Sequence, residues 1–344
     1  MENNVFIISQ DDLVKSGCID SKMVIDVVKD ALVSYCNGKV LFPDKVSQIF
    51  DENTQDRINC LPATLIDKKV CGVKWVSVFP SNVNRGIQNL SAVMILSSTE
   101  TGFPLAFLEA TVCSNLRTAA ISTVAAEYLA PNKVESIGFV GAGQQSRYHF
   151  TLLKYKFPTI KRCFVASRTK ESELAFINDF ASKYPDVEFV ACESDYEKSV
   201  RGRDILVTAI SGQSPIVKAD WIENGMLYLH VGGWEDEYDV ALKADKIVCD
   251  NWDSVKHRTQ TISRLYKEGK ISDDDIYCDI DELVSQKKCG RENEREFIYF
   301  NAVGLSFVDV ALAYRMYEEC ELKGNGTLFT LRSDETPMPE REEK

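Results

Sequence analysis

A glycine-rich turn carries the residues best suited to chemistry in this chain. It follows an apolar run and has the form Gly-x-Gly-x-x-Ser, with the residues Gly141, Ala142, Gly143, Gln144, Gln145 and Ser146. In such a turn the first glycine permits a sharp bend, the second lets backbone approach a pyrophosphate, and a small third residue lets helix and strand pack. The N-terminus of the following helix attracts phosphate. The turn therefore predicts a dinucleotide-binding site, with a purely structural turn as the alternative.

The end of the next apolar run predicts which dinucleotide binds. This run, at residues 162–167, ends near the place where a dinucleotide fold positions its ribose-reading residue. An NAD site carries Asp or Glu there, whereas this chain has Ser167, Arg168 and Thr169. A hydroxyl and a guanidinium suit a 2′-phosphate. We therefore favour NADP(H), with NAD(H) as the second choice; alternatively, Arg168 belongs to a solvated loop.

Two further strand ends should line the same site, because ligands of open parallel sheets bind beyond the carboxyl ends of the strands. The apolar runs at 204–210 and 226–233 supply these ends. The residues expected to line the cofactor are Thr208, Ala209, Ile210, Val231 and Gly232. In the acidic loop that follows, Glu235 and Asp236 are candidate general acids or bases toward an amine. The alternative is that this loop is acidic because it is solvated.

Two cations interrupt apolar surroundings. Lys74 lies in Gly-Val-Lys-Trp, and Arg117 lies in a helical segment rich in Ala, Ser and Thr. A buried charge is costly unless it meets a partner, so each cation needs an anion. A substrate α-carboxylate would serve, and a structural salt bridge with Asp or Glu is the alternative. Lys45 is a weaker candidate, expected on an exposed strand.

The elements that must position these residues indicate an α/β fold with two domains. The pattern predicts a curved, mostly antiparallel sheet before residue 110 and a connecting helix at 110–129. Strands alternating with helices then predict a doubly wound parallel sheet. We expect a first domain at 1–117, completed by about 310–331, and a dinucleotide-binding domain at 118–309. The charged tail at 334–344 is expected to be disordered.

Composition excludes several classes of function. The net charge of −12 disfavours nucleic acid and anionic membranes as partners, because both repel an acidic surface. The start of the chain lacks a signal-peptide pattern and no apolar run is long enough to span a membrane, so we expect a cytoplasmic protein. The 11 cysteines are scattered, and the 3 histidines are not at metal-ligand spacing. We therefore expect reduced, mostly buried thiols and no metal site.

A series of motifs resembles the ornithine cyclodeaminase/μ-crystallin family. The series runs in order along the chain from about residue 5 to residue 331, and its main motifs lie at residues 72–75, 114–120, 141–144, 290–292 and 301–309. The resemblance implies a nicotinamide-dependent enzyme that acts at the α-carbon of an amino acid or imine, built as a homodimer through its first domain.

The same resemblance implies roles for individual residues. The family's carboxylate-binding lysine and arginine fall on Lys74 and Arg117, and Lys45 takes a further substrate position where cyclodeaminases carry arginine. Trp234 stands where cyclodeaminases place an aspartate, which counts against ring closure with loss of ammonia. Within the family, the chain looks most like the siderophore-pathway branch that oxidises N-(2-amino-2-carboxyethyl)-L-glutamate. Its Ser-Arg-Thr segment at 167–169 is more like that of the NADP(H)-using ketimine reductases.

These observations lead to one preferred hypothesis about activity. Lys74 and Arg117 would hold the α-carboxylate of an amine while hydride passes from the α-carbon to the nicotinamide. Water would then convert the iminium to a keto acid and an amine, and the reverse reaction is imine reduction. The alternatives are an ornithine-type cyclodeaminase that recycles its nicotinamide internally, a ketimine reductase, and a crystallin-like protein that binds cofactor without catalysis.

Overall fold

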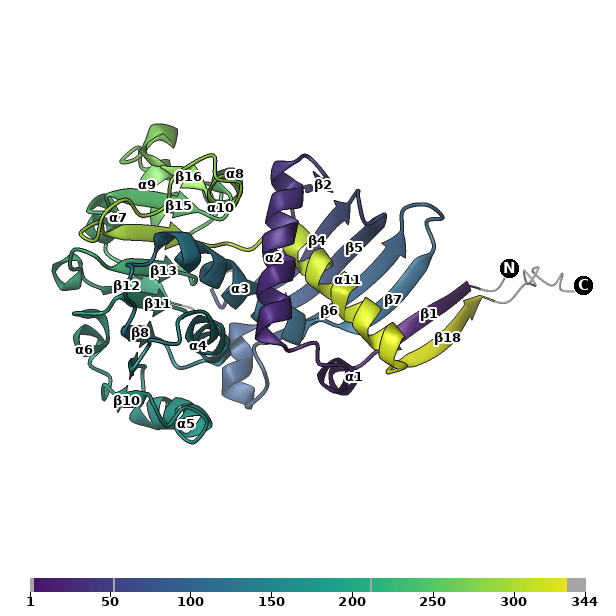
Figure 1. Ribbon diagram of the computed structural model, residues 1–344, viewed down its shortest axis with the longest axis horizontal. Helices are drawn as coiled ribbons and strands as arrows, with labels where there is room; N and C mark the ends of the chain where they lie inside the picture. The colour runs from purple at the N-terminus through teal and green to yellow at the C-terminus, as the bar shows by residue number, and fades with distance from the viewer. Residues whose placement is uncertain (1–2, 52, 211, 333–344) are drawn as a thin grey trace, which may run out of the picture. The chain divides into compact units, whose positions relative to one another are not determined.

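The computed structural model describes residues 3–51, 53–210 and 212–332, which form two compact units (Figure 1). Among these residues, unit 1 contains 3–19, Lys39–Cys113 and 309–332. Unit 2 contains Asp20–Gly38 and Ser114–Val308. The predicted disordered tail at 334–344 lies outside the described residues.

Unit 1 is built on an eight-stranded sheet with the order β18-β1-β7-β6-β5-β4-β2, in which β3 also pairs with β4. All these pairs are antiparallel except β1 with β7. The strands are β1 (Asn3–Ile8), β2 (Val40–Leu41), β3 (Val46–Asp51), β4 (Asp56–Leu65), β5 (Val70–Val78), β6 (Leu90–Ser98), β7 (Pro104–Glu109) and β18 (Thr327–Arg332). The expected mostly antiparallel sheet is confirmed, and the last strand of the chain pairs with the first.

One face of this sheet is covered by helix and the other is exposed. Helix α11 (Ser306–Lys323) packs on the covered face, where a Cβ placed on Gly72 would lie 2.9 Å from the Val310 side chain. On the opposite face Trp75, Ile95 and Phe107 are each about two-fifths exposed. The short helices α1 (Gln10–Lys15) and η1 (Pro80–Arg85) complete unit 1.

Unit 2 is built on an eight-stranded parallel sheet with the order β10-β9-β8-β11-β13-β17-β15-β16. From β8 the chain adds strands on one side, and it then crosses to β11 on the other side. This reversal is the topological switch point where open α/β sheets bind ligands. The strands are β8 (Ser136–Val140), β9 (Arg162–Ala166), β10 (Glu188–Ala191), β11 (Ile205–Thr208), β13 (Leu227–His230), β15 (Lys246–Cys249), β16 (Cys278–Asp279) and β17 (Ile298–Asn301). A separate short pair is formed by β12 (Gln213–Val217) and β14 (Trp234–Asp236).

Helix α2 packs in unit 2, although the sequence predicted a first domain that ran unbroken to residue 117. It buries one apolar stripe, including Val24 and Val28, and packs against α10 and α4. Chain order does not reveal which unit a helix packs on, which explains the difference. Helix α2 itself spans Ser21–Cys36. The other helices of this unit are α3 (Thr111–Leu129, which belongs to unit 2 from Ser114), α4 (Gln144–Lys156), α5 (Lys170–Phe180), α6 (Tyr196–Val200), η2 (Ala219–Trp221), α7 (Tyr238–Leu242), α8 (Trp252–Val255), α9 (Thr261–Lys267), η3 (Asp273–Asp275) and α10 (Ile280–Val284). No helix in the described parts of the chain has the length and hydropathy needed to cross a membrane.

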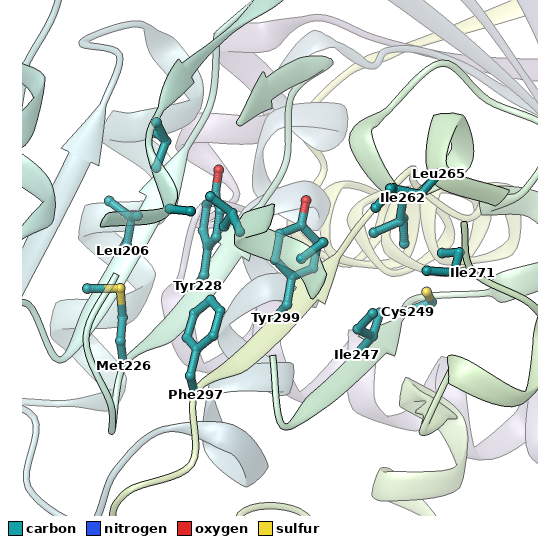
Figure 2. Close-up of a cluster of buried hydrophobic side chains, with 14 of the residues drawn as sticks. Leu206, Met226, Tyr228, Ile247, Cys249, Ile262, Leu265, Ile271, Phe297 and Tyr299 are labelled. Atoms are coloured by element: carbon teal, nitrogen blue, oxygen red, sulfur yellow. The ribbon is translucent and has the colours of Figure 1, made fainter. Parts of the chain in front are cut away.

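The core of the parallel sheet is built from large side chains of neighbouring strands (Figure 2). Tyr228 on β13 and Tyr299 on β17 are register partners whose rings lie 5.0 Å apart in an edge-on arrangement. Both are fully buried, and Figure 2 shows their hydroxyl groups on the same side of the cluster. Such continuous burial holds the strand ends rigidly in place.

Candidate active site

The glycine turn forms an open cradle at the start of α4. Gly141 has φ +111°, and a Cβ there would lie 2.9 Å from the carbonyl oxygen of Ala209. The Ser146 hydroxyl donates to the Gly141 carbonyl at 2.7 Å, which closes the turn from inside. Gly143 caps the helix, and no atom lies within 4 Å of the place where its Cβ would be. The space beside Gly143 is therefore open, which leaves room for a phosphate to approach the start of the helix.

A hydrogen bond joins this cradle to the helix that carries Arg117. Gln145, which is half-buried, donates from Nε2 to Asn115 Oδ1 at 2.8 Å, whereas Gln144 is exposed. The Arg147 guanidinium donates to the Ala142 carbonyl. The first turn of α4 is thus tied to α3 two residues before Arg117.

The loop after β9 presents an exposed guanidinium. Arg168 is exposed, while Ser167 is buried and Thr169 caps α5 by accepting from Ser172 N. The first turn of α5 contains two acids: Glu171 is exposed, and Glu173 is fully buried. The Glu173 carboxylate accepts three backbone N–H bonds, of 2.8, 2.7 and 2.9 Å, from Ser167, Glu193 and Ser194.

The ends of β11 and β13 meet beside the glycine turn. The Thr208 hydroxyl lies 3.0 Å from the Tyr228 hydroxyl, and Val231 N donates to the Thr208 carbonyl at 3.0 Å. Ile210 approaches the turn so closely that a Cβ on Gly141 would lie 2.8 Å from its side chain. The structure therefore brings the residues predicted from both strand ends to one edge of the sheet.

Glu235 and Asp236 are buried side chains of β14, so the alternative of a solvated acidic loop is wrong for both. Glu235 Oε1 accepts from Ile210 N at 2.8 Å, and a Cβ on Gly232 would overlap this oxygen. Burial raises the pKa of the Glu235 carboxyl. Its carboxyl group thus joins the ends of β11 and β13.

Asp236 belongs to a buried charge pair. Its Oδ1 lies 3.1 Å from His230 Nε2 and accepts from the Thr261 hydroxyl at 2.5 Å. Burial alone would lower the pKa of His230, but the Asp236 carboxylate outweighs burial and raises it. The pair therefore anchors β14 to β13 and α9.

Arg117 is buried within unit 2 at the carboxyl edge of the parallel sheet. It lies against Gly304, which follows β17, since a Cβ on Gly304 would be 2.3 Å from Arg117 Nη1. Asp250, which follows β15, interacts electrostatically with Arg117. A cation that could bind a carboxylate is thus at the same sheet edge as the glycine turn.

Lys74 lies in unit 1 on the helix-covered face of β5. It is 1% exposed, and its Nζ lies 2.6 Å from Asp309 Oδ1 at the start of the unit 1 part of α11. The buried lysine therefore does have a carboxylate partner, the arrangement named as the alternative. Lys45 lies just before β3 and is half-buried, not an exposed strand residue as expected.

Sequence reasoning missed three residues of this edge: Asp250, Gln260 and Gly304. Gln260 Nε2 donates to the carbonyl oxygens of Gly232 and Ala302 at 2.7 and 3.0 Å, and so joins the ends of β13 and β17. Asp250 directly follows β15, and Gly304 lies three residues after the end of β17. This position after a strand end is the one local signal that could have identified them.

Comparisons with known proteins agree with this architecture. The model of the ornithine cyclodeaminase/mu-crystallin family matches residues 7–324. The chain is 27% identical, over 96% of its length and 100% of the relative, to N-((2S)-2-amino-2-carboxyethyl)-L-glutamate dehydrogenase of Staphylococcus aureus.

Two solved structures are similar over nearly the whole chain. The Δ1-pyrroline-2-carboxylate reductase of Thermococcus litoralis, in complex with NADH and L-proline, has a TM-score of 0.89 and 31% identity, covering 94% of this chain and 99% of that one. An archaeal alanine dehydrogenase dimer with bound NAD has a TM-score of 0.87 and 30% identity, covering 96% and 100%. The expected fold class is confirmed, and the chain belongs to the ornithine cyclodeaminase/μ-crystallin family.

Proposed function

We propose that this protein is an NADP(H)-dependent oxidoreductase that acts on the C–N bond of an α-carboxylated amine or imine. One observation carries the proposal: the open glycine cradle and the buried Arg117 occur at the same carboxyl edge of one parallel sheet. A dinucleotide site beside a carboxylate-binding cation suits oxidation at an α-carbon. The similar proteins named above are dehydrogenases and a reductase of this kind.

The residues present fit a nicotinamide dinucleotide. The glycine turn and the first turn of α4 would hold the pyrophosphate, and the strand ends at 208–210 and 231–232 would hold the nicotinamide half. The bound cofactor would supply hydride acceptance and donation at the substrate α-carbon. The two similar solved structures contain NADH and NAD, respectively.

The preference for NADP(H) rests on the loop after β9. Arg168 is exposed there, and the buried Glu173 carboxylate is fully engaged by three backbone N–H groups. A carboxylate held inward in this way does not accept from ribose hydroxyls. A guanidinium at this position favours the 2′-phosphate.

For the substrate, we propose that Arg117 and Lys74 bind the α-carboxylate and that Lys45 contacts a more distant polar group. Arg117 supplies a planar fork of donors, and Lys74 supplies a point charge 2.6 Å from the Asp309 carboxylate. Holding the carboxylate fixes the α-carbon for hydride transfer, which is where most of the rate enhancement would arise.

We assign Glu235 and Asp236 positioning roles in place of the expected direct proton transfer. Both are fully buried, and their described contacts are to backbone and side chains of unit 2 itself. A general acid or base must reach the proton that it transfers. These carboxyl groups would instead keep the strand ends in register around the cofactor.

We also propose that two copies associate through the exposed face of the unit 1 sheet. Ile7, Phe107 and Ile95 form one row across β1, β7 and β6, because Phe107 is the register partner of both isoleucines. Trp75 on β5 extends this apolar face. A monomer seldom leaves such a contiguous apolar surface in water, and an isologous dimer would cover it.

A substrate panel tests the proposed activity. N-(2-amino-2-carboxyethyl)-L-glutamate, L-alanine and L-proline would each be offered with NAD⁺ and NADP⁺, and Δ1-pyrroline-2-carboxylate with NADH and NADPH. The proposal predicts a change in absorbance of the reduced cofactor with at least one of them, larger with the phosphorylated dinucleotide. N-(2-amino-2-carboxyethyl)-L-glutamate should be tested first, because the similar Staphylococcus aureus protein is a dehydrogenase of this compound. Turnover without any net change in cofactor redox state would contradict the proposal.

A further inference from the structure

The Arg117 guanidinium rests directly on the backbone of Gly304. A Cβ at position 304 would lie 2.3 Å from Nη1 and 3.0 Å from both Cζ and Nη2, so no other residue leaves room for the guanidinium. Gly304 also has φ +90°, a backbone conformation that L side chains rarely adopt. Two independent features, the approach and the dihedral angle, thus require glycine here.

The carboxylate of Asp250 accepts hydrogen bonds from the backbone of the turn that contains Gly304. Asp250 Oδ2 accepts from Val303 N at 2.8 Å and from Gly304 N at 2.7 Å, and its Oδ1 accepts from Asn251 N at 2.9 Å. Asp250 is only 1% exposed. Burial raises the pKa of Asp250 to about 6, although these N–H groups and the positive charge of Arg117 oppose the rise.

Asp250 and Gly304 are held at the same sheet edge by the strands before them. β15 and β17 are parallel neighbours, and Asp250 N donates to the Asn301 carbonyl at 3.0 Å just beyond their paired residues. Asp250 and Gly304, which both interact with Arg117, are therefore supported by β15 and β17. This support is separate from the glycine turn that would bind cofactor.

We propose that Asp250 and Gly304 are positioning residues that fix the plane of the Arg117 guanidinium for recognition of the substrate carboxylate. Bidentate binding of a carboxylate requires the donor fork to hold one plane. An arginine side chain that is already immobilised loses less conformational entropy when the anion binds. The inference rests on the role proposed above for Arg117, and it adds which groups give that arginine its geometry.

Equilibrium binding of a non-reacting anion tests the inference without catalysis. The probe is pyrrole-2-carboxylate, titrated calorimetrically into the protein in the presence of NADP⁺, and pyrrole-2-carboxamide is its uncharged counterpart. We expect Gly304→Ala to weaken carboxylate binding roughly tenfold or more, the scale of one lost charge-assisted hydrogen bond. The binding of NADPH, measured by its fluorescence, should change little.

A matched variant controls for backbone strain. Gly202 has φ +67° in the same unit, and a Cβ there would have no atom within 4 Å. Gly202→Ala therefore introduces comparable strain without touching Arg117, and it should leave carboxylate affinity unchanged. Equal losses in the two alanine variants would overturn the inference. Should Gly304→Ala fold poorly, Asp250→Asn provides the same comparison, with Asp279→Asn as the control for removing a buried acid.

A double-mutant cycle separates this inference from the proposed function. If Gly304 acts through Arg117, Gly304→Ala should add no further loss of carboxylate affinity in an Arg117→Ala background. Additive losses would overturn the inference while leaving the role of Arg117 intact. If Arg117→Ala by itself leaves carboxylate affinity unchanged, the role proposed for Arg117 fails, and the inference fails with it. A crystal structure of Gly304→Ala should show the Arg117 guanidinium displaced. An unmoved guanidinium would contradict the proposal that Gly304 fixes its position.

Discussion

The Glu235 carboxyl group accepts a hydrogen bond of 2.8 Å from the backbone N–H of Ile210, 25 residues earlier in the chain. This bond, together with the contact between Glu235 and Gly232, joins the ends of two parallel strands at the edge where a nicotinamide would bind. Burial raises the pKa of Glu235 and so favours its neutral form. A neutral carboxyl group still has an oxygen that accepts from Ile210 N, so this hydrogen bond does not require a negative charge.

The first prediction separates positioning from proton transfer at Glu235. Glu235→Gln keeps an acceptor for Ile210 N, so we expect kcat and the Kd for NADPH to stay within about threefold of the wild type, well under the tenfold that roughly 1.4 kcal/mol represents. Glu235→Ala leaves that N–H unsatisfied and should weaken cofactor binding by about tenfold. Steady-state kinetics and fluorescence titration supply both values. A glutamine variant as inactive as the alanine variant would restore the acid-base role.

The second prediction concerns Arg168. Replacing it with alanine removes a charge-assisted contact to the 2′-phosphate, so kcat/KM for NADP⁺ should fall by about tenfold to a hundredfold. The value for NAD⁺ should stay nearly constant. Lys170→Ala is the matched control, because that neighbouring cation already pairs with Glu193. Equal losses with the two dinucleotides would show that Arg168 does not read the phosphate.

The third prediction concerns the buried pair of Lys74 and Asp309. Lys74→Met leaves the Asp309 carboxylate without this cation in the interior, which should cost about 3–5 kcal/mol of unfolding free energy. The double variant Lys74→Met/Asp309→Leu should recover much of that stability while remaining inactive. Urea unfolding followed by circular dichroism measures both. Lys69→Met breaks the solvent-exposed pair with Glu100 and should change stability little; a similar loss in that control would contradict the argument.

The fourth prediction is a pH dependence of stability that arises from Asp279. Burial raises the pKa of Asp279 to about 7, whereas an unfolded chain has a value of about 4. The folded state therefore holds this proton more tightly, and stability from this group falls as pH rises from about 4 to about 7. Asp279→Asn retains an acceptor for Trp252 N and removes the penalty.

Thermal unfolding across this pH range measures the effect. The melting temperature of Asp279→Asn should exceed that of the wild type at pH 8, and the difference should shrink toward zero near pH 4. Asp253→Asn, at an exposed side chain in α8, should show no such trend. A difference that stays constant with pH would contradict the assignment to Asp279.

The fifth prediction concerns the row formed by Ile7, Phe107 and Ile95. Phe107→Lys places a charge at the centre of the proposed contact between copies, so sedimentation velocity should show a monomer where the wild type is a dimer. Phe103→Lys is the control, because Phe103 is equally exposed but precedes β7. A wild-type monomer, or a Phe107→Lys dimer, would rule out this face.

Sequence patterns were sufficient for the parts of the structure that depend on local order. The run before Gly141 contains the apolar residues Ile137, Phe139 and Val140 typical of a buried parallel strand, and the two glycines indicate the turn that follows. Fold class and the cofactor edge were predictable for that reason. The cation Arg117 was also identifiable, because a charge within a small-residue helix needs an explanation.

The remaining features depend on contacts between distant residues. Asp250 meets the backbone of Gly304 across 54 positions, and nothing around either residue signals the other. Glu235 looked solvated because Asp236, Glu237 and Asp239 follow it closely, yet β14 turns it inward. The placement of α2 was missed because its apolar stripe does not specify a partner.

The most direct test of the central claim is transfer of isotope from substrate to cofactor. A substrate deuterated at the α-carbon, chosen as the most active member of the panel, would be incubated with the protein and NADP⁺. We predict that deuterium appears at C4 of the nicotinamide in net NADPH, in equal amount to the keto acid released. Consumption of substrate with no net NADPH and no deuterium in the recovered cofactor would contradict the account.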